Sequence, residues 1–355
     1  MNRSTLSNPT FTTSSMDAYG NETVSLTTAP PVVTWSRAER QFQVVCLAII
    51  MIIGITGNGL VILSVIMSRR LRTVTNVYVV NLALTDLLTV LNIPWSVVAL
   101  LSTNRTGWPL AERLCVHAAG TSIVCVNSSI YTMVMIAISR LIMVTSKRNY
   151  RNAWTLKRSW VIAAVIFIWS ISVFVSLLPV LFDVGKLGFD TRYGSCTWDS
   201  SHPNSPTYST ILAVLWFPVS FSVIIVCYLL VFRHIRNHTK MMKSDLTLRN
   251  TTDNKLAHRL NKTQIQVTKN LFCVVIVYVI CLTPFGVCLM LDSDGSIKAT
   301  PYAAMILILN SCLNPLIYAA KHPNFKSVFK SILKCDLNGI PDRACCLGNT
   351  TNRSN

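Results

Sequence analysis

The chain has 355 residues, of which 51% are hydrophobic and only 13% are charged. Soluble domains carry about 25% charged residues, so apolar segments dominate this sequence. The formal net charge of +18 first suggests a nucleic-acid-binding protein. We exclude that class because the basic residues lie in short segments between apolar blocks and not on one polar domain, so we expect no nucleic-acid partner.

The first 40 residues are rich in Ser, Thr, Asn and Pro and lack the short apolar core of a signal peptide. This composition is typical of a disordered segment. Glycosylation sequons begin at Asn2 and Asn21 within it and at Asn104 further along the chain. We expect residues 1–40 to form a disordered, glycosylated segment.

Seven apolar stretches are each long enough to cross a bilayer, which takes about 20 residues. They cover residues 41–68, 74–102, 114–145, 159–182, 207–233, 267–291 and 300–320. Helices satisfy their own backbone hydrogen bonds in lipid, and the alternating segments of a membrane barrel are absent from the sequence. We predict an all-α membrane protein with a seven-transmembrane helix bundle over residues 41–320.

The positions of the Lys and Arg residues predict the orientation of this bundle. Of the 32 basic residues, 24 lie in the odd-numbered loops, in the C-terminal tail and at the ends of the spans that border them. The N-terminal segment and the even-numbered loops hold the remaining 8. Because basic residues collect on the cytoplasmic side, we expect a multi-pass plasma-membrane protein with its N-terminus outside and its C-terminus inside.

Residues 321–334 form an amphipathic pattern after the last span. One face is apolar and a separate stripe is basic: Phe325, Val328, Phe329 and Ile332 against Lys326, Lys330 and Lys334. This pattern predicts a short eighth helix lying on the inner membrane surface, in contact with membrane lipids. The tail over residues 335–355 is expected to be disordered. Its cysteines Cys335, Cys345 and Cys346 are candidates for palmitoylation, and unmodified thiols are the alternative.

Two charged residues lie at unusual places in the spans. Asp86 is the one acid deep inside a span, where a carboxylate is costly and usually functional. Polar residues expected at a similar depth are Asn58, Ser129, Asn310, Ser311 and Asn314. Such oxygens suit a hard cation, and an interhelical hydrogen-bond network without an ion is the alternative. Arg140, at the inner end of the third span, either reaches the lipid headgroups or contacts a cytoplasmic partner.

The twelve cysteines show no CxxC spacing, which disfavours a zinc site or a redox motif. Cys115, at the outer start of the third span, and Cys196, in the loop between spans four and five, are the cysteine pair expected on the outer side. This compartment is oxidising, so we predict a disulfide between them that ties the loop over the bundle. Five prolines inside the spans favour kinks: Pro94, Pro179, Pro218, Pro284 and Pro315.

Over residues 41–335 the chain resembles a rhodopsin-like (class A) G protein-coupled receptor. The motifs that carry this resemblance appear in order on the seven spans. They are Gly57-Asn58, Leu82-Ala-Leu-Thr-Asp86, Trp108 before Cys115, Ser139-Arg140-Leu141, Trp169 with Pro179, Pro218, Cys281-Leu-Thr-Pro284, and Asn314-Pro315-Leu-Ile-Tyr318 followed by Phe325.

The resemblance implies roles for individual residues. Asp86, Ser129, Asn310, Ser311 and Asn314 match the family's sodium pocket, so an allosteric sodium ion is the one cofactor it suggests. Arg140 matches the arginine that meets a heterotrimeric G protein after the sixth span swings outward, and Tyr318 matches a tyrosine that rotates inward. Pro284 and Pro315 belong to the motifs that change shape on activation. Arrestin and receptor kinases are further implied partners.

The chain departs from the family pattern at several of these positions. Ser139 stands where an acid usually restrains the arginine, Leu141 replaces a Tyr, Leu282 replaces the Trp of the sixth span, and Tyr278 replaces a Phe. One hypothesis is that the resting state is less restrained, so that basal signalling is raised. The alternative is a decoy or scavenging receptor with weak or no G protein coupling.

The family's ligand pocket lies in the outer half of the bundle. The matching residues here are Ser122, Ile123, Val126, Thr210, Ile211, Val214, Phe285, Leu289, Ala304 and Ile308. An amine ligand favours a carboxylate at Ser122, and a retinal Schiff base requires a lysine in the seventh span, so both ligands are disfavoured. A neutral or lipid-like small molecule, or a peptide read by the outer loops, remains. The pattern loosely resembles melatonin receptors, although the intact Asn314-Pro315 departs from them, and no subfamily is assigned.

Other classes of membrane protein fit less well. A transporter usually shows repeated halves and several charges at mid-membrane. The sequence holds no HExxH, GxSxG or phosphate-binding glycine loop, so we do not expect an enzyme. The third inner loop, residues 234–263, carries seven basic residues and two acids. This charge is explained either by attraction to anionic lipid or by a surface for a G protein or arrestin.

Overall fold

The computed structural model describes residues 35–102, 108–145, 157–245, 272–291 and 293–344. Within these ranges seven helices are long and apolar enough to cross a membrane. The predicted all-α architecture with seven spans is therefore confirmed. Several predicted modification sites lie outside the described residues, namely Asn2, Asn21, Asn104, Cys345 and Cys346.

The first span, α1 (Arg37–Met67), begins earlier than the predicted residue 41 because of its N-terminal cap. The Ser36 side chain accepts a hydrogen bond from the Glu39 backbone, and the Glu39 carboxylate accepts one from the Ser36 backbone at 2.7 Å. This capping box satisfies two N–H groups that the first turn of a helix leaves free. A short 3₁₀ turn, η1 (Arg69–Leu71), follows α1.

The second span is divided into α2 (Val74–Leu91) and α3 (Ile93–Leu101). The break falls at Asn92, two residues before Pro94, whose ring nitrogen cannot donate to the preceding turn. The third span, α4 (Glu112–Thr145), and the fourth, α5 (Arg158–Phe182), are continuous helices, and Pro179 lies inside α5.

The fifth span consists of α6 (Ser205–Val214), the π-helical segment η4 (Leu215–Val219) and α7 (Ser220–Asp245). Pro218 lies in the π-helical segment, as expected where a proline interrupts the regular hydrogen bonding of a helix. The sixth span is the helix Phe272–Met290. The seventh, α9 (Asp294–Lys321), starts before the predicted residue 300 because Ser293 and Ser296 form a second capping box.

A two-stranded antiparallel hairpin, β1 (Leu187–Asp190) and β2 (Ser195–Trp198), follows α5 and places Phe189 opposite Cys196. Gly194 in its turn has φ 61°, a conformation that favours glycine. The buried Asp190 carboxylate accepts backbone hydrogen bonds from Tyr193 at 2.9 Å and Ser200 at 2.6 Å. This rigid loop was not predicted from the sequence.

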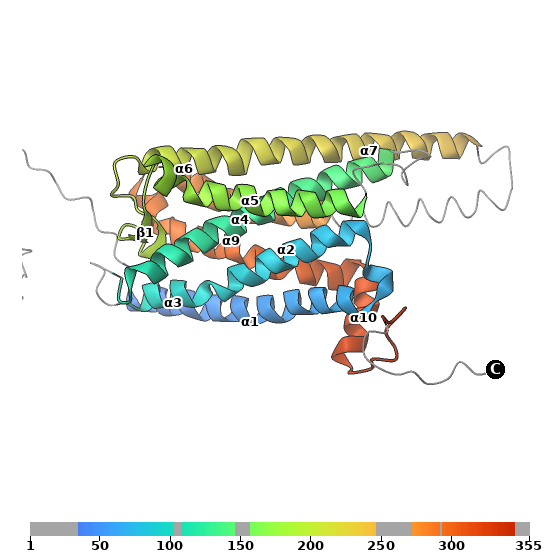
Figure 1. Ribbon diagram of the computed structural model, residues 1–355, viewed down its shortest axis with the longest axis horizontal. Helices are drawn as coiled ribbons and strands as arrows, with labels where there is room; N and C mark the ends of the chain where they lie inside the picture. Colours follow the sequence, from blue (N-terminus) through green and yellow to red (C-terminus); the bar gives the residue numbers. More distant parts are fainter. Residues whose placement is uncertain (1–34, 103–107, 146–156, 246–271, 292, 345–355) are drawn as a thin grey trace, which may run out of the picture. The chain divides into compact units, whose positions relative to one another are not determined.

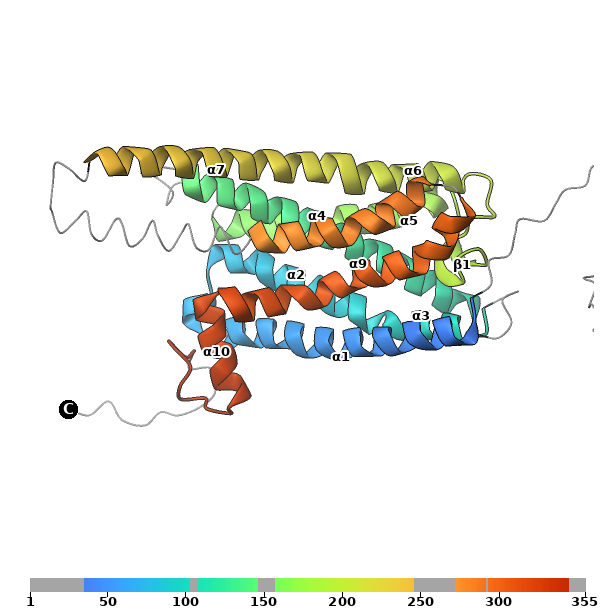
Figure 2. The same cartoon turned by 180° about the vertical axis from the view of Figure 1, so that it is seen from behind.

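The predicted eighth helix is present as α10 (Pro323–Leu333), with Phe325, Val328 and Phe329 buried and Lys326 and Lys330 exposed. Figure 1 shows α10 at the end of the bundle opposite to β1. Seen from behind, in Figure 2, α9 runs beside α1 and leads into α10.

The segment after α10 differs from the predicted disordered tail. Residues 336–344, which we name the tail strap, fold back onto the inner end of α1. Ser68 donates its hydroxyl hydrogen to Pro341 O at 2.8 Å, and the Ala344 backbone N–H donates to Met67 O at 2.8 Å. Ile340 is buried at 4% exposure. These contacts join residues about 270 positions apart, so sequence patterns near the tail do not reveal them.

The spans bury polar side chains in their core, and they carry large apolar side chains on their outer surface as well as inside. Val180, Phe167 and Ile280 are each more than 60% exposed, as expected of side chains that face lipid. Gly57 marks a close approach between α1 and α9, since a Cβ there would lie 2.9 Å from Pro315 Cβ. The polar residues predicted to lie at mid-membrane are all buried inside the bundle.

Candidate functional site

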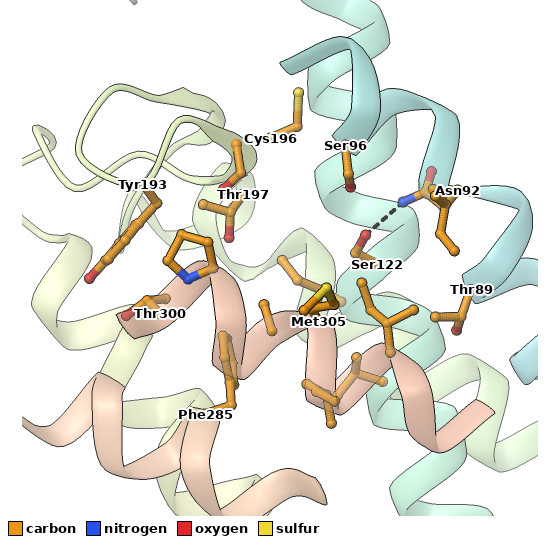
Figure 3. Close-up of a pocket in the computed structure, with 18 of the residues that line it drawn as sticks. Thr89, Asn92, Ser96, Ser122, Tyr193, Cys196, Thr197, Phe285, Thr300 and Met305 are labelled. Atoms are coloured by element: carbon orange, nitrogen blue, oxygen red, sulfur yellow. Dashed lines mark hydrogen bonds between the residues drawn. The ribbon is translucent and has the colours of Figure 1, made fainter. Parts of the chain in front are cut away.

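A cavity of about 200 Å³ opens among the outer halves of the spans, beneath the β1–β2 hairpin. Figure 3 shows side chains of spans two, three, six and seven converging on it, with Tyr193 and Thr197 of the hairpin segment above. The Cys115–Cys196 disulfide joins β2 to the outer end of α4, with 5.2 Å between the two Cα atoms. The predicted disulfide therefore holds one wall of the cavity in place.

Seven of the ten predicted pocket residues line this cavity. They are Ser122, Ile123, Val126, Phe285, Leu289, Ala304 and Ile308. Most are apolar, and none is charged, as the sequence predicted for this level of the bundle. Such walls, with a few polar groups placed among them, are typical of small-molecule sites.

The three predicted residues of span five do not line the cavity in this structure. The buried residues of α6 are Ser205, Tyr208 and Leu212, so the inward face of the helix follows the spacing i, i+3, i+7. Thr210, Ile211 and Val214 lie on other faces, and Val214 is 47% exposed. Span five instead contributes Trp216, which follows α6 in the π-helical segment.

Several cavity residues were missed by sequence reasoning. Asn92 donates hydrogen bonds to Ser122 Oγ at 2.6 Å and to Ala118 O at 2.9 Å, which ties the break in span two to α4 (Figure 3). Trp216 donates to Asn127 at 2.6 Å and its ring lies 6.4 Å from that of Phe285. The sequence signal for both positions was the residue type, because Asn92 and Trp216 are hydrogen-bonding side chains inside otherwise apolar spans.

At its lower end the cavity reaches the polar core of the bundle. Asp86, Ser129, Asn310 and Ser311 line it. Asn314, the fifth predicted residue of this group, donates a hydrogen bond to Asp86 Oδ2 at 2.8 Å. The structure thus brings all five residues of the predicted sodium pocket to one region.

The polar core has more acceptors than donors. Four buried oxygens have no hydrogen-bond partner among the described residues: the Oδ1 atoms of Asn58, Asp86, Asn310 and Asn314. The Asn58 amide is already used, because it donates to Ser311 O at 2.8 Å and to Gly54 O at 3.0 Å. Unpartnered buried acceptors are costly, so this arrangement suits water or a cation.

Arg140 lies near the inner end of α4 and is buried at 4% exposure. Its Nη1 makes a long contact of 3.7 Å to Met143 Sδ, and its Nε has no hydrogen-bond partner within the described ranges. In the described part of the chain no carboxylate forms an ion pair with it. Ser139 cannot form an ion pair with Arg140 because its hydroxyl is neutral, and this hydroxyl donates to Ile136 O at 2.8 Å.

The remaining predicted activation residues lie in the sixth and seventh spans. Tyr318 is buried, and its ring stacks on Phe325 with 5.5 Å between the ring centroids. Its hydroxyl has no hydrogen-bond partner in the part of the chain that the structure describes. Tyr228 in α7, which sequence reasoning missed, is also buried, and its hydroxyl likewise has no partner among the residues described. Leu282 is fully buried, while Pro284 is half-buried and Pro315 lies inside α9.

Comparison with known proteins identifies the class. The family model described as "7 transmembrane receptor (rhodopsin family)" matches residues 57–318. This chain therefore belongs to that family and is a rhodopsin-like G protein-coupled receptor, a multi-pass membrane protein and not an enzyme.

Individual relatives share less than a third of their aligned residues with this chain. The melatonin receptor type 1B of Rattus norvegicus is 29% identical over 290 residues, which cover 79% of this chain and 74% of the relative. Melanopsin of Podarcis siculus is 28% identical over 297 residues, which cover 82% of this chain and 61% of melanopsin. The crystal structure of squid rhodopsin shares the fold, with a TM-score of 0.71 at 22% identity over 91% of this chain and 94% of that one.

Proposed function

We propose that the receptor binds a small extracellular ligand in the cavity beneath the hairpin and thereby activates a heterotrimeric G protein at Arg140. The observation that carries this proposal is the layout of α4. Ser122 and Ser129 line the cavity and Arg140 lies on the same helix. Ser129 and Arg140 are eleven residues apart, roughly 16 Å along the axis, so a ligand and a G protein can bias the same helix.

The orientation supports this assignment of the two ends. With 24 of the 32 basic residues on one side, the α10 end faces the cytoplasm and the hairpin faces outward. We therefore propose that the receptor lies in the plasma membrane with its N-terminal segment outside. Glycosylation of Asn2, Asn21 and Asn104 belongs to the same proposal.

At the level of Ser122 the cavity walls are uncharged and mostly apolar, so they suit a small ligand that is itself largely apolar and uncharged there. Its volume of about 200 Å³ is below the roughly 300 Å³ at which pockets for drug-sized ligands begin. A lipid-like molecule fits the apolar walls formed by Val126, Phe285 and Ile308. A peptide is the less favoured ligand, because the hairpin covers the cavity.

Asp86, Ser129, Asn310, Ser311 and Asn314 fit a sodium ion, because they offer hard oxygen atoms of which several are buried without a partner. The ion would neutralise the buried carboxylate. An ion held between α2 and α9 would favour the arrangement in which Asn314 contacts Asp86.

On the inner side, G protein coupling rests on Arg140 and on the basic third inner loop. Arrestin and receptor kinases are proposed partners of this loop and of the tail. Ser244, Thr247 and Thr251 in the loop are candidate phosphate acceptors. Thr247 and Thr251 lie outside the described residues. Cys335 is exposed just after α10, which supports its palmitoylation next to the membrane surface.

The test is nucleotide exchange on a panel of purified G proteins by the receptor in lipid nanodiscs. Because Arg140 forms no ion pair with any described residue, we expect exchange above the level of empty nanodiscs even without ligand, and loss of this effect in Arg140→Ala. A correctly folded receptor that leaves every G protein at its intrinsic rate, with ligand-driven internalisation in cells, would instead indicate the decoy or scavenging receptor.

A further inference from the structure

Two buried donors at the outer end of α1 have no hydrogen-bond partner among the described residues. They are the Nε of Arg40 and the Nε2 of Gln43. Gln43 is 3% exposed, and Leu47, one turn further along the helix, is 4% exposed. The spacings of three and four residues place Arg40, Gln43 and Leu47 on one face of the helix. Span one therefore presents two unpartnered donors on its buried face.

Arg40 and Gln43 line two adjoining cavities. Gln43 and Leu47 line the cavity of about 200 Å³ beneath the hairpin. Arg40 lines a smaller cavity of about 20 Å³, which is enough for roughly one water-sized group. The residues that line both cavities, and so form their shared wall, are Leu100, Tyr193, Gly194 and Pro301.

The guanidinium of Arg40 is a half-buried cation that forms no ion pair with any carboxylate of the described residues. Its Nη1 makes a long contact of 3.5 Å with the carbonyl oxygen of Ser102. The neighbouring Glu39 is engaged in the capping box of α1. By contrast, Lys186 on the outer surface pairs with the exposed carboxylate of Glu112 at 3.4 Å. Arg40 thus carries a positive charge for which the described structure supplies no counterion.

Aromatic side chains surround this cation. Trp35, Phe189 and Tyr193 line the small cavity together with Arg40. The hairpin turn packs against them, since a Cβ at Gly194 would lie 3.8 Å from the Trp35 ring. Apolar walls lower the local dielectric constant, which strengthens the attraction between Arg40 and an anion.

The main cavity continues inward from this corner along α9. Pro301 lines both cavities and lies seven residues before Ile308, roughly 10 Å along the helix axis. Asp86, the one charged side chain that the described residues contribute to the main cavity, lies at its floor. Figure 3 shows Tyr193 of the hairpin segment and Thr89, one turn outward from Asp86, on opposite sides of the cavity. An anionic group beside Arg40 is therefore remote from the carboxylate of Asp86.

We propose that the ligand is an amphipathic monocarboxylate whose carboxylate pairs with Arg40 and accepts a hydrogen bond from Gln43, while its apolar body extends into the cavity beneath the hairpin. The guanidinium and the amide supply the charge-assisted hydrogen bonds that carboxylate oxygens favour. The inference rests on the proposed ligand cavity and adds the class of ligand. The uncharged walls at the level of Ser122 fit such a molecule, because its charge lies only at its outer end.

The experiment measures thermal unfolding of the purified full-length receptor in detergent at neutral pH with 4-phenylbutyrate. The neutral amide 4-phenylbutyramide has nearly the same shape and is the control ligand. We expect 4-phenylbutyrate, well above its dissociation constant, to raise the unfolding midpoint by roughly 2–4 °C, and the amide to have no effect. The concentration dependence of the midpoint gives the apparent dissociation constant.

Two variants and one matched control locate the site. Arg40→Gln removes the charge and raises the apparent dissociation constant at least about tenfold. Gln43→Leu removes the second donor with little change in size and has an effect of the same order, so it also covers the case in which Arg40→Gln does not fold. Arg37→Gln removes an exposed cation from the same turn of α1, and it retains the full shift.

Four results would overturn the proposal. The first is no stabilisation by 4-phenylbutyrate. The second is equal stabilisation by the amide, which would keep the ligand cavity but exclude a carboxylate site. The third is a shift that survives unchanged in both Arg40→Gln and Gln43→Leu. The fourth is an equal loss in Arg37→Gln, which would indicate general attraction to surface charge. None of these results involves nucleotide exchange, so failure here is distinct from failure of G protein coupling.

Discussion

The side-chain amide of Asn314 in α9 donates a 2.8 Å hydrogen bond to the carboxylate of Asp86 in α2. Both residues are 1% exposed, so spans two and seven are joined at mid-membrane by a contact shielded from solvent. Asn314 lies one turn before Tyr318, whose ring packs against α10. The single helix α9 therefore connects the contact with Asp86 to the inner end of the bundle.

We predict that Asp86→Asn makes the stability of the receptor insensitive to sodium. The carboxylate supplies the charge that a sodium ion needs, whereas the amide retains the shape and the contact with Asn314. The measurement is the unfolding midpoint in sodium chloride and in choline chloride, which should differ for the wild type and coincide for the variant. Glu112→Gln should behave like the wild type. A sodium effect of full size in Asp86→Asn would place the ion elsewhere.

We predict that Ser139→Asp lowers basal nucleotide exchange about fivefold or more. A carboxylate beside Arg140 supplies the ion pair that the structure lacks and stabilises the resting state, and coupling energies of 1–3 kcal/mol correspond to factors of about 5–150. Ser139→Ala, which adds no charge, should leave the basal rate unchanged. The account of Arg140 is wrong if the wild type shows no basal activity and Ser139→Asp changes nothing.

We predict that the disulfide between Cys115 and Cys196 stabilises the receptor by about 2–4 kcal/mol. Cys115→Ser, Cys196→Ser and the double variant should lower the unfolding midpoint by equal amounts, because each removes the same bond. Cys46→Ser, at a half-buried free cysteine of α1, is the control and should have a small effect. Additive losses in the double variant would show that the two cysteines act independently.

We predict that stability falls as the pH is lowered from about 6.5 to about 4, through His322. This residue lies between α9 and α10, where burial and then the charge of Arg140 lower its pKa to about 4 from 6.5. The unfolded chain therefore takes up the proton first, and the loss amounts to roughly 3 kcal/mol at completion. His322→Gln should flatten this part of the stability profile relative to wild type. An unchanged profile would assign the acid sensitivity to other groups.

We predict that Ile340→Ala releases the tail strap from the inner end of α1. Ile340 is 4% exposed, whereas Leu337 in the same segment is 42% exposed, so Leu337→Ala is the matched control. The backbone amides of Arg69 and Ala344, which bond to Asp342 and Met67, report on release by hydrogen exchange. Their exchange should accelerate at least about tenfold in Ile340→Ala only. Equal acceleration in both variants would mean that the side chain of Ile340 does not anchor the strap.

The spans were predictable because each is a long apolar run, and the sodium-pocket residues because polar groups inside such runs are few. Contacts between distant segments were not predictable. The hairpin depends on Asp190 accepting from Ser200, and the tail strap depends on Ser68 meeting Pro341. The inward face of α6 also escaped prediction, because an apolar helix in lipid shows little difference between its two sides.

The most direct test of the central claim measures the distance between the inner ends of the third and sixth spans. Spin labels at Thr145→Cys, the exposed last residue of α4, and at Phe272→Cys, which is 43% exposed, report this distance. Cys273 and the tail cysteines Cys335, Cys345 and Cys346 are replaced by Ser, so that these thiols take up no label. With a nucleotide-free G protein bound, we predict a second population at longer distance, as the sixth span moves away from Arg140. A single distance distribution that no G protein of the panel alters would contradict the account.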